Sequence, residues 1–209
     1  MRKKKINHKK HQLEINDKTS KLIAYTKKET AVIATFDTAD LEKVEAFENW
    51  RAVWSSEFDC AVIESKDFEN GYAKRTPIAA AILSCSVNAP IRHINGDKLD
   101  NRRENLEIYD LSLNPNEFKL ENDVATIILK DRYGRIIDEA IVDLDVVDEI
   151  ILKRGVWVKK KRANGQPYVV NPDGILLAHA ILDVLEGFVI YENKNPLDNR
   201  RKNIKIIEQ

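Results

Sequence analysis

One segment of eight residues occurs twice in this chain of 209 residues, and such a duplication constrains the fold more than any local pattern. Residues 99–106 read LDNRRENL and residues 197–204 read LDNRRKNI, at an offset of 98 residues. Upstream, residues 78–83 (IAAAIL) correspond to residues 177–182 (LAHAIL) at an offset of 99, so a single-residue insertion or deletion separates the two registers. The sequence therefore predicts two similar folding units in tandem.

Each repeat is predicted to begin with a pair of β-strands. Alternating or β-branched residues indicate strands at 22–25 and 31–36 in the first repeat. The same kind of pattern indicates strands at 125–129 and 135–142 in the second repeat. Each pair is expected to form a small antiparallel sheet.

A helix is predicted to follow the strand pair in each repeat. In the first repeat, apolar residues recur at three-residue steps behind a helix cap at Asp37 or Thr38. The residues of this stripe are Leu41, Val44, Phe47, Trp50 and Val53. An acidic segment after the strands leads to Trp54 in the first repeat and to Trp157 in the second, and we expect these two tryptophans to correspond.

The polar, turn-forming tract at 114–116 (NPN) is predicted to separate the repeats. We therefore expect a flexible basic arm at 1–19, a first repeat at 20–113 and a second at 114–209. The expected fold class is α+β.

The charges of the chain are unevenly distributed. The 34 basic and 34 acidic residues cancel overall, but the first twenty residues carry seven Lys or Arg against two carboxylates. The remainder is mildly acidic, with 27 basic and 32 acidic residues. The basic tail could follow a phosphate backbone with salt-sensitive affinity, although such tails are also common as solubilising segments.

The sequence argues against several classes of protein. The two cysteines, Cys60 and Cys85, form no CxxC pair, so neither a zinc knuckle nor a disulfide framework is indicated. The N-terminus lacks an apolar signal region, and no apolar run approaches the length of a membrane span. We expect a cytoplasmic protein without a membrane partner.

Residues 91–106 read IRHINGDKLDNRRENL, and this segment resembles the signature of phage-type HNH homing endonucleases. The family pattern is an Asp-His pair that ends a strand, a turn of Asn-Gly type, and an Asn-rich segment that opens a helix and closes with Asn-Leu. The strand pair, the tryptophan, the segment 71–73 (GYA) and the apolar segment 78–83 are also similar to the family. The resemblance implies a ββα-metal motif at the end of each repeat, and a phage or prophage origin.

Proteins of this family cut or nick DNA with one divalent metal ion, held by the Asp before the His and by the last Asn, while the His activates a water molecule. By resemblance, His93 would be the base, Asn101 would pin the loop, and Asn105 would bind the metal. Arg92 stands where the family has Asp. A guanidinium at ~4 Å from a dication would be repelled by roughly 8 kcal/mol at an effective dielectric constant of about 20.

The second repeat departs further from the family. Ile190 and Tyr191 stand at the Asp-His pair, whereas Asn199 and Asn203 remain. His179 aligns with a family histidine on the apolar helix, and we expect it to be structural. No cofactor is therefore expected, and Mg²⁺ or Mn²⁺ would be needed only if the first repeat were active.

The leading hypothesis is a catalytically inactive, HNH-derived protein that works as a DNA-binding or regulatory protein. Arg92 then acquires a role, because a guanidinium can bind phosphate oxygens in a bidentate manner. The predicted DNA-contacting residues are Arg2, Lys3, Lys4, Lys5, Arg92, Arg102, Arg103, Lys159, Lys160, Lys161 and Arg162. The last four precede residues 163–165 (ANG) and are expected on a hairpin or loop.

The duplicated segments also have a purely structural interpretation. Asp100 and Asp198 could cap a helix, while Asn105 and Asn203 could satisfy backbone groups.

Two other functions stay open at this point. The acidic body could bind a basic groove of another protein, for instance as a phage-encoded modulator of a host nucleic-acid enzyme. Alternatively, the chain could be a metal-dependent nickase in which His93 and Asn105 recruit a further carboxylate, either Asp97 or Asp100.

Overall fold

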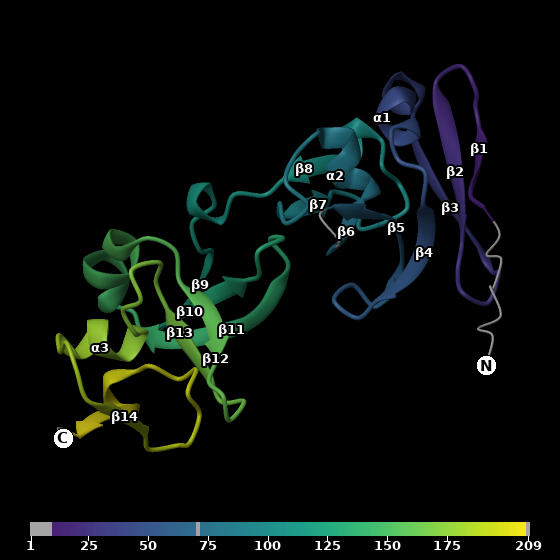
Figure 1. The fold of residues 1–209 in the computed structure, drawn as a ribbon. Helices are drawn as coiled ribbons and strands as arrows, with labels where there is room; N and C mark the ends of the chain where they lie inside the picture. The colour runs from purple at the N-terminus through teal and green to yellow at the C-terminus, as the bar shows by residue number, and fades with distance from the viewer. Residues whose placement is uncertain (1–9, 70–71, 208–209) are drawn as a thin grey trace, which may run out of the picture. The chain divides into compact units, whose positions relative to one another are not determined.

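The computed structural model describes residues 10–69 and 72–207 and shows a mixed α+β chain of small antiparallel sheets and short helices (Figure 1). The expected α+β class is confirmed. The chain divides into two compact units, Met1–Ile108 and Tyr109–Gln209, here called the first unit and the second unit. In the part of the chain that is described, no helix combines the length and the apolar character needed to cross a membrane.

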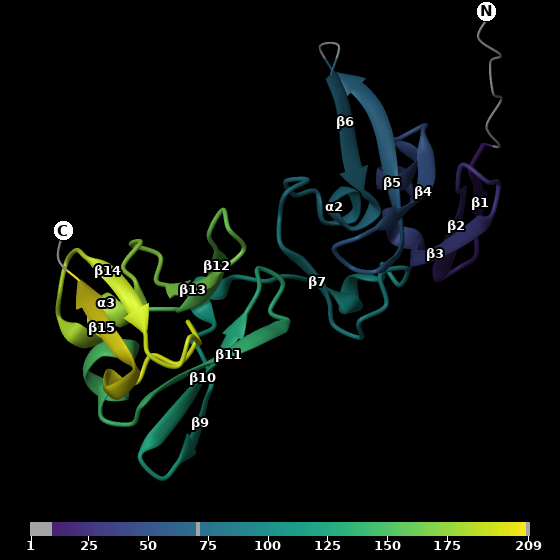
Figure 2. The same cartoon turned by 90° about the horizontal axis from the view of Figure 1, so that it is seen from below.

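The first unit contains two three-stranded sheets and a terminal hairpin, which can be followed in Figure 2. Its elements are β1 (Gln12–Glu14), β2 (Thr19–Tyr25), β3 (Ala31–Asp37), η1 (Thr38–Asp40), α1 (Leu41–Glu45), β4 (Trp50–Ser55), β5 (Cys60–Glu69), β6 (Tyr72–Pro77), α2 (Ile78–Leu83), β7 (Ile91–His93), η2 (Arg103–Asn105) and β8 (Leu106–Ile108). The sheets have the orders β1-β2-β3 and β4-β5-β6, and β7 pairs with β8. Leu22, Phe36, Ile63 and Ile82 are fully buried in the core of this unit.

The second unit contains a three-stranded sheet and two hairpins. Its elements are η3 (Leu111–Leu113), β9 (Phe118–Glu121), β10 (Val124–Lys130), β11 (Ile136–Asp143), η4 (Val147–Ile151), η5 (Leu152–Arg154), β12 (Val158–Lys161), β13 (Pro167–Val170), α3 (Leu177–Leu182), β14 (Phe188–Tyr191), η6 (Arg201–Asn203) and β15 (Ile204–Ile207). The sheet has the order β11-β10-β9, and the hairpins are β12-β13 and β14-β15. Trp157 is the largest fully buried side chain.

The predicted strand pairs are confirmed in both units. Strands β2 and β3 pair antiparallel along their whole length, and β10 pairs with β11. The alternation that predicted them corresponds to burial of every second side chain of β2. The basic run at 159–162 lies on the β12-β13 hairpin, as expected.

The predicted arm at 1–19 differs from the structure at its C-terminal end. Residues 1–9 lie outside the described residues, but Gln12–Glu14 form strand β1. Leu13 stands opposite Leu22 in the sheet and packs against the core, and one apolar side chain among many charged ones gave too weak a signal for a strand.

The long helix predicted in the first unit is wrong. Helix α1 ends at Glu45, and both Trp50 and Val53 belong to strand β4. Trp50 and Ala52 are buried on one face of this strand, where every second side chain points inward. Trp50 also lies three residues after Phe47, and this coincidence made the strand look like a continuation of the helical stripe. Neither Asp37 nor Thr38 caps α1 with its side chain.

The expected correspondence of Trp54 with Trp157 is also wrong. The side chain of Trp54 is 67% exposed, whereas Trp50 and Trp157 are buried. The indole Nε1 of Trp50 donates to the carbonyl of Val44 (2.9 Å), and that of Trp157 donates to Ile151 (3.1 Å), six residues upstream in both cases. Trp50 therefore has the structural role that Trp157 has in the second unit.

Candidate functional site

The loop between β7 and β8 is attached to the outer edge of strand β3. Thr35 N–H donates to the carbonyl of Leu99 (2.8 Å), and Asn101 N–H donates to the carbonyl of Thr35 (2.7 Å). Because β3 is an edge strand, these bonds satisfy backbone groups that would otherwise be open to solvent.

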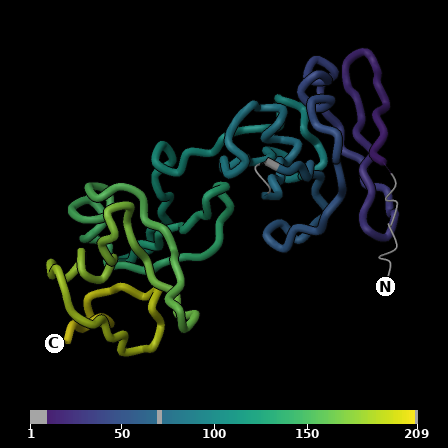
Figure 3. Tube along the Cα trace, viewed as in Figure 1, coloured from purple at the N-terminus to yellow at the C-terminus, as the bar shows by residue number. Residues whose placement is uncertain are grey.

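The loop between β14 and β15 is attached to β11 in the same manner, and both loops can be followed in the trace of Figure 3. Ile141 N–H donates to the carbonyl of Leu197 (2.8 Å), and Asn199 N–H donates to the carbonyl of Ile141 (2.7 Å). Leu197 and Asn199 lie 98 positions after Leu99 and Asn101, respectively.

The candidate metal ligand Asn105 is occupied by hydrogen bonds within its loop. Its Oδ1 accepts from Asn95 N–H (2.8 Å) and its Nδ2 donates to the carbonyl of Asp100 (2.7 Å). Asn203 makes the matching pair of bonds at 2.9 and 2.6 Å in the second unit. Both asparagines are 4% exposed, so their amides satisfy backbone groups that water does not reach.

Asp100 forms a bidentate ion pair and caps no helix. Arg102 donates from Nε (2.9 Å) and Nη2 (2.8 Å), and Asn95 Nδ2 donates to Oδ2 (2.9 Å). Arg200 and Asp198 form the same bidentate pair in the second unit. The predicted capping role is therefore wrong for both aspartates.

The first turn after each ion pair is capped by an aspartate distant in sequence. Arg103 N–H donates to Oδ2 of Asp37 (2.8 Å), and Arg201 N–H donates to Oδ2 of Asp143 (2.7 Å). The turns η2 and η6 that follow contain three residues each, where the family pattern implied a helix. The aspartate at the end of each edge strand thus accepts the hydrogen bond from the first N–H of the turn, which a neighbouring cap residue usually accepts.

The Arg102 guanidinium lowers the pKa of the Asp100 carboxyl to about 2. Since this folded-state pKa lies below the ordinary value of about 3.9, the stabilisation is complete above about pH 4 and is lost as the pH falls toward 2. We expect the free energy of unfolding to fall less between neutral pH and about pH 3 in Asp100→Asn than in the natural chain. The difference should be at most ~1 kcal/mol, because the folded-state carboxylate is still mostly ionised at pH 3 and because Arg102 is partly exposed. Urea unfolding at both pH values measures this difference. The exposed Asp17, as Asp17→Asn, serves as the control, and an equal acid dependence in both variants would contradict the assignment.

The candidate base His93 has partners at both ring nitrogens. Nε2 lies 3.2 Å from Oδ1 of Asn101, and Nδ1 lies 3.3 Å from Nζ of Lys98. Lys98 can only donate, so Nδ1 is the acceptor and Nε2 carries the proton. Burial and the charge of Lys98 lower the pKa of His93, which favours the neutral imidazole near pH 7. In the second unit the hydroxyl of Tyr191 approaches Oδ1 of Asn199 at 3.5 Å.

Arg92 does not share the environment of His93. Successive residues of β7 point to opposite faces, and the guanidinium of Arg92 donates from Nε to Oε2 of Glu107 (3.0 Å), its partner across the hairpin. Arg92 keeps its sequence position next to His93, but its guanidinium lies with Glu107 on the other face of the hairpin. What works against a metal ion beside His93 is the occupied amide of Asn105.

The residues that the family would use do not fit a divalent ion in this arrangement. Asp100 is bound by Arg102, and Oδ1 of Asp97 accepts from Leu99 N–H (2.9 Å). Within 10–69 and 72–207, no cluster of three or more His, Cys, Asp or Glu side chains could hold a metal ion.

The other predicted DNA-contacting residues have diverse surroundings. Arg2, Lys3, Lys4 and Lys5 lie outside the described residues. Arg103 donates to the buried carboxylate of Asp40 (2.7 and 2.6 Å), and Lys159 donates to Asp138 (2.8 Å). Lys160, Lys161 and Arg162 are exposed on the β12-β13 hairpin, and Arg162 lies over the ring of Tyr168.

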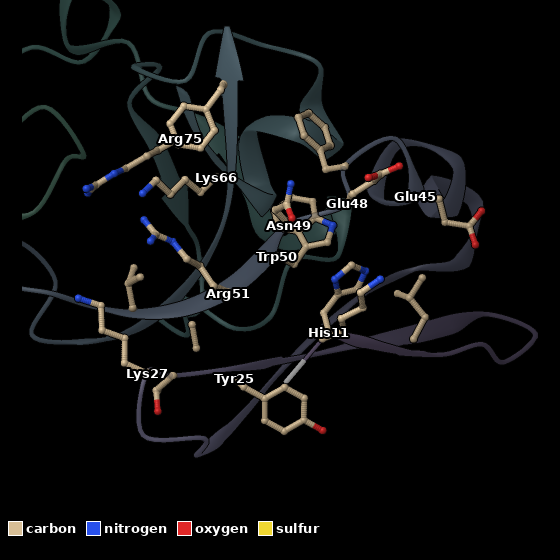
Figure 4. A pocket seen from close by; sticks show the side chains of 17 residues that line it. His11, Tyr25, Lys27, Glu45, Glu48, Asn49, Trp50, Arg51, Lys66 and Arg75 are labelled. Atoms are coloured by element: carbon tan, nitrogen blue, oxygen red, sulfur yellow. The ribbon is translucent and has the colours of Figure 1, made fainter. Parts of the chain in front are cut away.

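A groove of about 1100 Å³ in the first unit was not predicted from the sequence (Figure 4). It is lined by residues of β1, β2, α1, β4, β5 and β6 and of the segments that flank them, and its cationic side chains are Lys10, Lys27, Arg51, Lys66 and Arg75. Arg51, Lys66 and Arg75 come from three separate strands, so only the register of the sheet brings these three together. The alternation of residues 64–68 (ESKDF) was the local signal that could have indicated one polar face.

Comparison with known proteins gives no relative from which a function could be transferred. No family model, no curated protein and no solved structure matches the chain.

Proposed function

We propose that this chain is a catalytically inactive derivative of an HNH homing endonuclease that arose by tandem duplication. It works as a DNA-binding or regulatory protein. The duplication is supported by hydrogen bonds that recur in the two units, where the loop residues that make them are 98 positions apart. In each unit the asparagine, Asn105 or Asn203, accepts a hydrogen bond from the backbone N–H ten residues upstream. In each unit an aspartate, Asp37 or Asp143, caps the equivalent turn. Matching bonds of this kind are expected if one scaffold was copied and then kept for its fold.

The loss of catalysis is supported mainly by the bonding of His93. Its Nε2 faces Asn101 and its Nδ1 faces Lys98, so neither nitrogen is left to take a proton from water. Tyr191 occupies the equivalent position in the second unit, and a phenol is a poor base near neutral pH.

The nickase alternative would need Asp97 or Asp100 as a metal ligand. Both carboxylates already accept hydrogen bonds from their own loop, which disfavours this alternative. The protein-binding alternative relies on the acidic body of the chain. Two carboxylates of this body, Asp143 and Asp145, already accept hydrogen bonds from Arg201 within the second unit.

We expect labelled DNA to bind with an affinity that falls as salt rises, because cationic side chains displace condensed counterions. Gel shifts with single-stranded and duplex oligonucleotides over a salt series measure this. We also expect no nicking of supercoiled plasmid with Mg²⁺ or Mn²⁺, for the natural chain and for His93→Ala alike. Metal-dependent nicking that is lost in His93→Ala would overturn the proposal, as would failure to bind either form of DNA at low salt.

A further inference from the structure

Three cations project from one face of the β4-β5-β6 sheet. Arg51 stands opposite Glu64, and Lys66 stands opposite Arg75 in the register of β5 and β6. Like charges directly opposite each other destabilise an antiparallel pair. The Lys66–Arg75 pair therefore lowers the stability of the hairpin unless an anion lies between the two side chains.

The charge of this cluster is only partly neutralised by the residues that the structure describes. Glu64 Oε1 lies 2.6 Å from Arg51 and 3.8 Å from Arg75, so one carboxylate serves two guanidinium groups. The buried Nε of Arg51 has no acceptor among the described residues. Figure 4 shows Arg51, Lys66 and Arg75 gathered on one side of the groove, away from Glu45 and Glu48. The groove is therefore electrically polarised, and its basic side suits a phosphate group.

An exposed aromatic ring lines the same groove. The side chain of Phe68 is 70% exposed, and Nζ of Lys66 lies 5.4 Å from its ring centroid. On the neighbouring strand Tyr72 is 81% exposed, but Tyr72 does not line the groove. Since Phe68 is paired with Ala73, the adjacent Tyr72 points to the opposite face of the sheet.

We propose that this groove binds a single nucleic-acid strand, whose phosphates contact Arg51, Lys66 and Arg75 while one base stacks on Phe68. This inference rests on the proposed binding of DNA and names the surface and the form of nucleic acid. A base can stack on a side chain only where it is not already stacked within a duplex, so the exposed ring favours an unpaired strand. Phosphates contact the basic side of the groove, and repulsion from Glu45 and Glu48 keeps them from its other side.

Fluorescence anisotropy with labelled oligothymidylate tests this surface. We expect Phe68→Ala to weaken binding roughly 5- to 100-fold, the range for loss of one stacked base. The double variant Lys66→Gln with Arg75→Gln should reduce the slope of log affinity against log salt by about 1.4, since two phosphate contacts are lost. The matched controls are Tyr72→Ala and the double variant of two exposed lysines of the second unit, Lys153→Gln with Lys202→Gln, which should leave both quantities unchanged. All of these side chains are exposed or half-buried, so none of the variants should lower the midpoint of thermal unfolding. Removal of the like-charged Lys66–Arg75 pair should raise this midpoint or leave it unchanged.

The outcomes separate the groove from the general function. If oligothymidylate binds and the groove variants behave as their controls do, the groove proposal is overturned while DNA binding stands. If only duplex DNA binds, or if it binds more tightly than oligothymidylate, the groove proposal is again overturned and the proposed function survives. If neither form binds at low salt, both proposals are wrong.

Discussion

Trp157→Ala is expected to lower the free energy of unfolding of the second unit by about 3–5 kcal/mol. Trp157 is fully buried, and its removal would leave a cavity in the core of this unit. It would also leave the carbonyl of Ile151, which accepts from the indole Nε1, without that donor. Urea unfolding followed by far-UV circular dichroism, with amide hydrogen exchange resolved along the chain, would assign the loss to residues 109–209.

Trp54→Ala is the matched control for this prediction. This side chain is 67% exposed, so we expect a change within about 0.5 kcal/mol. A loss at Trp54 as large as the loss at Trp157 would contradict the burial that the structure assigns to the two tryptophans.

Asn105→Ala is expected to lower the free energy of unfolding of the first unit by about 2–4 kcal/mol. The change would remove the acceptor of Asn95 N–H and the donor to the carbonyl of Asp100 at a site that is 4% exposed. Each backbone group left unsatisfied away from water costs about 1–3 kcal/mol. Urea unfolding measures the change, and Asn203→Ala should give a loss of similar size in the second unit.

Asn16→Ala is the control, because Asn16 is exposed and the hydrogen bond of its side-chain amide to the carbonyl of Thr19 is long at 3.4 Å. The backbone carbonyl of Asn16, which accepts from Thr38, is kept in this variant. We expect a change within about 0.5 kcal/mol for this variant. If Asn105→Ala were equally mild, the duplicated asparagine would not be structural, and the case for a metal ligand at this position would have to be reopened.

The elements that the sequence predicted well are those with a local periodic signal. The alternation at 22–25 and 125–129 predicted strands β2 and β10. The basic run before residues 163–165 was predicted on a hairpin or loop, and it lies on the β12-β13 hairpin. The helix predicted through Trp50 failed because a stripe at three-residue steps can run from a short helix into a strand whose buried side chains alternate. Local periodicity thus located elements better than it located their ends.

The α+β class, the pairing of the main strands and the two positions of the recurring loop segment all follow from local patterns along the chain. The tertiary structure decided what the loop residues do: Asp37 caps a turn 66 positions away, Arg92 pairs across its hairpin, and Asn105 holds backbone groups. It also decided which cations share the groove, because Arg51, Lys66 and Arg75 meet only through the register of three strands. The reason is physical: alternation and turn formation depend on neighbours along the chain, whereas hydrogen-bond partners and charge clusters depend on which distant segments pack together.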